Sequence, residues 1–105
     1  MLPSLKEKKR YIVFEIKGEH KIDFNDVKKE IDTKMLKFLG ELGYGKAGLM
    51  IVEGNGNKGI IKVNNKHVDE ARTALALVKD LNDEKVVIQT LGVSGILKKA
   101  KERWN

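Results

Sequence analysis

The segment LGVSGILKK (residues 91–99) holds the residues whose types and spacing are closest to chemistry, because Ser94 stands between glycines ahead of two lysines. A nucleophilic serine needs a general base within hydrogen-bond reach and a third group that orients that base. The segment is one residue short of a Gly-x-Ser-x-Gly elbow, and the chain has only two histidines, His20 and His67. The pattern therefore favours a turn in which Ser94 caps a following helix.

The same turn has a second interpretation. A helix start exposes backbone N–H groups and the positive end of the helix dipole, which together attract anions. Ser94 and Gly95 could therefore hold a phosphate group, with Lys98 and Lys99 nearby. The two roles compete for the serine only in part, and the sequence leaves both open.

The remaining polar motifs favour structural roles. His20 and His67 have no spacing that predicts a metal site, and the carboxylates alternate with lysines as on a solvated helix face. The glycine-rich stretch EGNGNKG (residues 53–59) lacks the Gly-Lys-Ser/Thr ending of a phosphate-binding loop and instead predicts a hairpin turn. We therefore predict no catalytic residue and no metal ligand.

The net charge of +6 is concentrated at the two ends of the chain, while residues 11–93 are neutral overall. Clustered charge creates a local potential, which favours a polyanion partner, although two solvated basic tails would have the same composition. The candidate phosphate-binding cations are Lys6, Lys8, Lys9, Arg10, Lys98, Lys99, Lys101 and Arg103.

The length of 105 residues predicts a single domain over residues 1–105, with residues 1–7 as a flexible basic tail. No apolar run approaches the roughly 20 residues that span a bilayer, so no membrane partner is expected. The absence of cysteine is consistent with an intracellular, cytoplasmic protein.

Apolar periodicity predicts the elements that must position these residues. Alternation predicts a strand over 8–18, steps of three and four predict helices within 23–45 and 64–84, and two apolar runs around the Gly/Asn cluster predict a hairpin over 48–63. Residues 85–91 read as a further strand and 94–105 as a short basic helix. The order predicts an α+β, ferredoxin-like fold (split βαβ, RRM-like), an antiparallel sheet with two helices on one face plus a C-terminal basic helix.

This fold leaves one face of the sheet without core helices. Alternation assigns five apolar residues to that face, which we expect to be covered either by the terminal helix or by a protein partner. Ile96, Ala100 and Trp104 would form the apolar stripe of such a helix. RNA-recognition motifs stack bases on aromatics of this face, but the third strand here, KGIIKV, has isoleucines in their place. The candidate partner face consists of Tyr11, Val13, Ile51, Ile60 and Val87.

Four segments resemble one known family, archaeal ribonuclease P protein component 2. They are LPSLKEKKRYIVFEI, FLGELG, VDEARTALALVKDLN and VVIQTLGVSGILKKAKER, which span nearly the whole chain in the family's order. The resemblance implies a ferredoxin-like core with added helices. It also implies a subunit of the endoribonuclease that removes the 5′ leader of precursor tRNA, in which the RNA subunit performs the hydrolysis with Mg²⁺.

The implied partners are the ribonuclease P RNA and ribonuclease P protein component 3, with precursor tRNA contacted indirectly and self-association within a heterotetramer left open. The implied protein binds no cofactor itself. On this hypothesis the eight basic residues, Ser94 and Gly95 contact RNA phosphates. The alternative hypothesis is a ferredoxin-like protein-interaction or small-ligand regulatory domain that uses the open sheet face.

Overall fold

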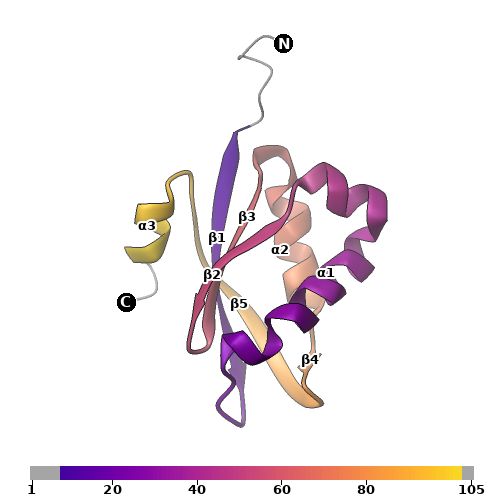
Figure 1. The fold of residues 1–105 in the computed structure, drawn as a ribbon, viewed down its shortest axis with the longest axis vertical. Helices are drawn as coiled ribbons and strands as arrows, with labels where there is room; N and C mark the ends of the chain where they lie inside the picture. The colour runs from indigo at the N-terminus through magenta and orange to yellow at the C-terminus, as the bar shows by residue number, and fades with distance from the viewer. Residues whose placement is uncertain (1–7, 103–105) are drawn as a thin grey trace.

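The computed structural model describes residues 8–102, which form a five-stranded antiparallel sheet with helices on both faces (Figure 1). This confirms the predicted α+β, ferredoxin-like fold; the tail predicted over residues 1–7 lies outside the described residues. The strand order is β2-β3-β1-β5-β4. None of the described helices is both long and apolar enough to cross a membrane. The elements are β1 (Lys9–Gly18), α1 (Phe24–Ala47), β2 (Met50–Asn55), β3 (Lys58–Asn64), η2 (Asn65–His67), α2 (Val68–Leu77), β4 (Asp80–Leu81), β5 (Glu84–Ser94) and α3 (Leu97–Glu102).

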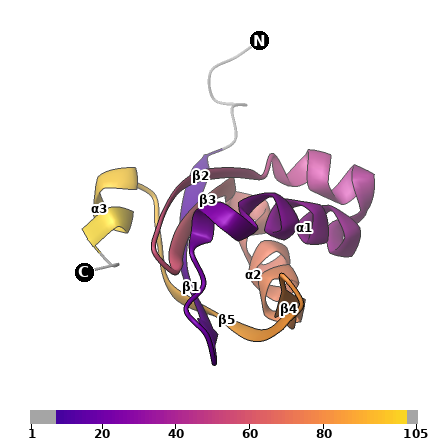
Figure 2. The same cartoon turned by 60° about the horizontal axis from the view of Figure 1, so that its bottom comes forward.

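The main core lies between the sheet and the two helices α1 and α2, which cover the same face (Figure 2). Ile12, Phe14 and Ile16 alternate along β1 and all point into this core, as their spacing predicts. The rings of Phe14 and Phe24 meet at a centroid distance of 5.9 Å, which ties the start of α1 to the sheet. Burial of such apolar side chains is the main stabilising contribution to the fold.

A capping aspartate sets the start of helix α1, and glycines set its kink and its end. The Asp23 side chain caps the helix by accepting a hydrogen bond from the Asn25 N–H at 3.0 Å. Gly40 adopts φ 75° and ψ 163° and kinks the helix, which then continues until Gly48 ends it at φ 58°. The apolar steps of three and four that predict this helix therefore do not mark a buried side beyond the kink, where Leu42 is 72% exposed.

The predicted β2–β3 hairpin is confirmed, and its glycines also make room for a core ring. A Cβ atom on Gly54 would lie 1.8 Å from Cδ2 of Phe24, and one on Gly59 would lie 2.5 Å from Cε1 of the same ring. The Gly/Asn cluster therefore forms the hairpin turn and also leaves space in which Phe24, the first residue of α1, packs against the hairpin. The Phe24 N–H also donates a hydrogen bond to the Gly56 carbonyl, which holds the start of α1 against the hairpin turn.

A bulge in β2 corrects the predicted face of one residue. Ile51 pairs with Ile61 and packs in the main core, whereas the sequence alternation assigned Ile51 to the opposite face. The pairing with β3 shifts between Ile51 and Glu53, so Val52 is an extra residue and Glu53 stands opposite Ile60. A bulge changes the face of every residue on one side of it, and the alternation pattern contains no sign of it.

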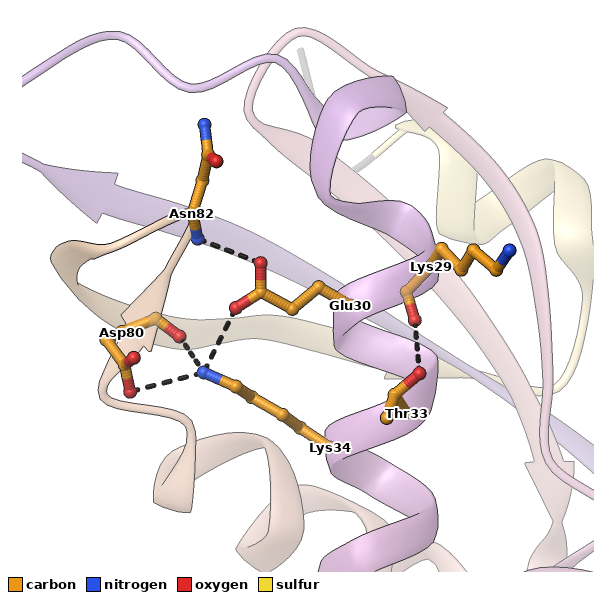
Figure 3. A network of polar contacts seen from close by, with 6 residues as sticks. All are labelled: Lys29, Glu30, Thr33, Lys34, Asp80 and Asn82. Carbon is orange, nitrogen blue, oxygen red and sulfur yellow. Dashed lines mark hydrogen bonds and ion pairs between the residues drawn. The ribbon is translucent and has the colours of Figure 1, made fainter.

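The short strand β4 replaces the end of the helix predicted over 64–84. Helix α2 ends at Leu77, and Asn82 and Asp83 adopt φ values of 53° and 64° in a two-residue turn between β4 and β5. Figure 3 shows how this turn is attached to α1: Lys34 Nζ lies 3.2 Å from Glu30 Oε2 and 3.2 Å from Asp80 Oδ1. The Asn82 N–H donates to the other oxygen of the Glu30 carboxylate at 2.8 Å.

Candidate nucleic-acid interface

Strands β1 and β5 bring the two basic ends of the chain together at one end of the sheet. They are antiparallel neighbours, with Tyr11 opposite Ser94, so the residues before Tyr11 lie beside the residues after Ser94. The guanidinium of Arg10 lies against Gly95, where an added Cβ would be 3.1 Å from Nη1. The sequence predicts two separate basic clusters, and the structure brings their described parts to the same end of the sheet.

Helix α3 holds the C-terminal lysines against the sheet face opposite α1 and α2 (Figure 1). Ala100 packs on Val13 and Ile60, all three are 0% exposed, and Leu97 packs beside them. The terminal helix therefore covers this part of the open face, which is one of the two covers that the sequence predicts. Helical spacing then leaves residues 98, 99 and 102 on the outer side of α3, where all three are exposed.

Lys98 and Lys99 make no ion pair with another described residue, whereas Lys101 does. Lys101 Nζ lies 2.7 Å from Glu53 Oε1, across from α3 to β2. The bulge at Val52 is what turns the Glu53 side chain to this face. Of these three lysines, Lys101 therefore has its charge partly neutralised within the protein.

Ser94 closes the turn before α3 and is not the helix N-cap itself, which corrects the prediction. Its hydroxyl accepts a hydrogen bond from the Ile96 N–H at 3.2 Å and donates one to the Ile96 carbonyl at 3.1 Å. The Ile96 carbonyl accepts the first helical hydrogen bond, from the Ala100 N–H at 3.0 Å, so Ile96 is the N-cap residue. A backbone N–H does donate to the serine hydroxyl, as expected of a cap, but Ser94 lies two residues before the N-cap residue.

The N-terminal basic residues lie along the end of β1. Lys8 is exposed, and its carbonyl accepts a hydrogen bond from the Asn65 N–H at 2.8 Å. Lys9 Nζ donates to Asn64 Oδ1, while Asn64 Nδ2 donates to the Lys46 carbonyl at 2.7 Å. The buried Asn64 thus links the N-terminal cluster to the end of α1. Lys6 and Arg103 lie outside the described residues.

Strand pairing also brings a further cation, Lys62, to this surface, and sequence reasoning missed it. Lys62 on β3 stands directly opposite Tyr11 and is partly exposed. Its neighbours Ile61 and Val63 point into the main core, so Lys62 points to the α3 face. In the sequence Lys62 is a lone polar residue between apolar ones, and only the pairing of residues far apart in the chain reveals its position.

The predicted partner face is largely occupied by α3. Val13 and Ile60 are fully buried beneath it, Tyr11 is partly buried at its edge, and Ile51 belongs to the other face. Val87 remains open, with 65% of its surface exposed. Within residues 8–102 no group of three His, Asp or Glu side chains could hold a metal ion.

Comparison with known proteins identifies the family of the chain. The model of the Rpp14/Pop5 family matches residues 10–105. The protein belongs to the Rpp14/Pop5 family. A relative from Thermococcus gammatolerans, named ribonuclease P protein component 2, is 41% identical over 104 residues, with 97% of this chain and 87% of the relative covered. Relatives with the same name from Archaeoglobus fulgidus and Methanosarcina acetivorans are 35% and 34% identical, covering 97% and 99% of this chain and 93% and 79% of their own lengths.

The fold of this Rpp14/Pop5 family member also matches a chain in the cryo-EM structure of yeast ribonuclease MRP. The TM-score is 0.68 over 94% of this chain and 92% of that one, at 15% sequence identity. At this identity the match concerns the fold alone. The family resemblance seen in the sequence is confirmed by the family model and by the named relatives.

Proposed function

We propose that this protein is the component 2 subunit of ribonuclease P and acts in the cytoplasm. It binds the catalytic RNA and has no catalytic residue of its own, while the RNA subunit removes the 5′ leader of precursor tRNA. The proposal is supported by the pairing of β1 with β5, which brings Lys8–Arg10 to the end of the sheet where the chain turns into α3 with its Lys98 and Lys99, in a chain of the Rpp14/Pop5 family.

The physical role of this surface is to neutralise phosphates. Close approach of RNA strands around an active site is opposed by phosphate repulsion, and protein cations that contact phosphates release bound counterions and lower that repulsion. Mg²⁺ performs part of the same task and also serves the RNA-catalysed hydrolysis. The RNA subunit should therefore reach its active shape at a lower Mg²⁺ concentration when this protein is bound.

Pairing with ribonuclease P protein component 3, and self-association within a heterotetramer, would use the free edge of β5. Strand β4 pairs only with Glu84 and Lys85, so the outer edge of the later β5 residues has no strand partner among the described residues. Residues 87–94 carry no charged side chain, and Val87 is exposed. Long uncharged edges are sites where another chain can add a strand.

Reconstitution tests the proposed function. Cleavage of precursor tRNA by the RNA subunit with component 3 is measured over a Mg²⁺ titration, with and without this protein. We expect the protein to shift half-maximal cleavage to lower Mg²⁺. An unchanged Mg²⁺ requirement would contradict the proposal, as would cleavage by the isolated protein without any RNA subunit.

A further inference from the structure

One row of side chains crosses the α3 face at the end of the sheet where the basic segments meet. Strand pairing places Met50 opposite Lys62, Lys62 opposite Tyr11, and Tyr11 opposite Ser94. Directly opposite residues have Cβ atoms about 4.5–5.5 Å apart, so these side chains are neighbours on the sheet. The chain neighbours Ile12, Ile51, Ile61 and Val93 all belong to the main core, which places the four members of the row on the opposite face.

Helix α3 covers the next row and leaves this one partly open. Ile60 stands opposite Val13 in that next row, and both are 0% exposed beneath Ala100. Tyr11 is only partly buried and packs against the edge of this cluster, while Met50 is 55% exposed. The phenol ring of Tyr11 is therefore supported by apolar packing and remains partly accessible from solvent.

The charges around Tyr11 favour an anionic ligand. Lys62 makes no ion pair with another described residue, and Lys9 precedes Tyr11 by two residues on the same strand. No acidic side chain belongs to the row, and Glu53 in the adjoining row is paired with Lys101. An aromatic ring flanked by lysines matches the two parts of a nucleotide, because bases stack on aromatic rings and phosphates bind cations.

We infer that Tyr11 and Lys62 form a binding site for one unpaired RNA nucleotide, with the base stacked on the Tyr11 ring and the phosphate beside Lys62. The inference rests on the proposed function and adds a base contact to its phosphate contacts. RNA-recognition motifs place stacking aromatics in their central strands. Here the third strand has isoleucines, and the aromatic residue is on the neighbouring strand β1.

Matched substitutions separate stacking from packing and from charge. The probe is a fluorescent oligouridylate of about ten nucleotides, and binding to the full chain is measured by anisotropy over a salt series. Tyr11→Leu keeps an apolar side chain against α3 but removes the aromatic ring, so affinity should fall about five-fold or more with little change in salt slope. Tyr11→Phe should bind as the unaltered protein does. Lys62→Ala should lower the salt slope by about 0.7, the value for one phosphate contact on single-stranded nucleic acid.

Photocrosslinking gives a second measurement that needs no substitution in the site. An oligouridylate carrying 5-iodouridine is irradiated in complex with the protein, and the adduct is located by mass spectrometry. The chain has two tyrosines, and Tyr44 is an internal control because its hydroxyl donates to Asp32 beside the helix-covered face. We expect an adduct on Tyr11 and none on Tyr44.

The outcomes distinguish this inference from the proposed function. Equal affinity of the Tyr11→Leu and Tyr11→Phe proteins, each with an unchanged thermal melt, would overturn the nucleotide site while leaving the phosphate surface intact. A Tyr11→Leu change that alters self-association in size-exclusion chromatography but not oligouridylate binding would also overturn it, in favour of a protein contact. Failure of the unaltered protein to bind the RNA subunit would instead contradict the proposed function.

Discussion

Removal of the charges of Lys98 and Lys99 together should flatten the salt dependence of RNA binding. Both side chains are exposed and neither forms an ion pair with another described residue, so each can contribute a full phosphate contact. Each contact contributes about 0.7–0.9 to the slope of log affinity against log salt, so the double alanine variant should lose about 1.4–1.8. Between about 50 and 200 mM salt, the affinity of the unaltered protein should therefore fall about seven- to twelve-fold more than that of the variant.

A control pair on α1 carries the same charge. Lys28 and Lys29 are adjacent, exposed and without an ion pair to another described residue, but α1 covers the other face of the sheet (Figure 2). Filter binding of the RNA subunit over the salt series compares Lys98→Ala/Lys99→Ala with Lys28→Ala/Lys29→Ala. Equal changes of slope in the two double variants would refute a localised surface, because net charge alone would then explain binding. If about six cations of the whole basic surface contact phosphates, total affinity should fall by roughly three orders of magnitude over this range.

Three further predictions concern packing, titration and pairing. Gly54→Ala should destabilise the fold by about 1–3 kcal/mol in chemical denaturation, because the added Cβ overlaps the Phe24 ring. The control Gly45→Ala adds a Cβ where no atom lies within 4 Å, so it should be neutral or stabilising by up to about 1 kcal/mol. Burial, together with the hydrogen bond to Asp32 and its charge, raises the pKa of Tyr44 to about 12, so an ultraviolet titration should show one tyrosine ionising there and Asp32→Asn should lower that pKa. Because the folded-state pKa is the higher one, the stabilisation from the Tyr44 proton is lost as the pH rises from about 10 through 12. Val87→Lys should weaken co-elution with component 3 while leaving oligouridylate binding unchanged; unaltered co-elution would argue against the β5 edge.

Local patterns in the sequence predict the parts of the fold that depend on near neighbours. The alternation of Ile12, Phe14 and Ile16 identifies the core face of β1, and Asp23 is a residue type that caps helices. The predicted apolar stripe of the last helix is confirmed at Ala100, which packs on a sheet face, whereas Ile96 is 54% exposed and Trp104 lies outside the described residues. Each of these features depends on residues that are close together in the chain. The local sequence pattern is therefore enough to predict them.

The features that sequence reasoning missed depend on contacts far apart in the chain. The extra residue at Val52 reverses the face of Ile51, and its position depends on the partner strand. The kink at Gly40 interrupts the helix predicted within residues 23–45, and the sequence does not distinguish a glycine that bends a helix from one that ends it, because positive φ serves either purpose. The convergence of the basic ends requires the pairing of Tyr11 with Ser94, which composition and periodicity do not contain.

The absence of cysteine allows a direct test of the claim that the two basic ends form one RNA-binding surface, because a single introduced cysteine can carry a hydroxyl-radical probe. Asn65→Cys lies beside Lys8, Ile96→Cys lies beside Ser94, and Leu42→Cys, beyond the kink of α1, is the control. The account predicts that probes at residues 65 and 96 cleave overlapping stretches of the ribonuclease P RNA, while the probe at residue 42 does not. Cleavage at separate, non-overlapping regions from residues 65 and 96, or the same pattern from all three positions, would contradict it.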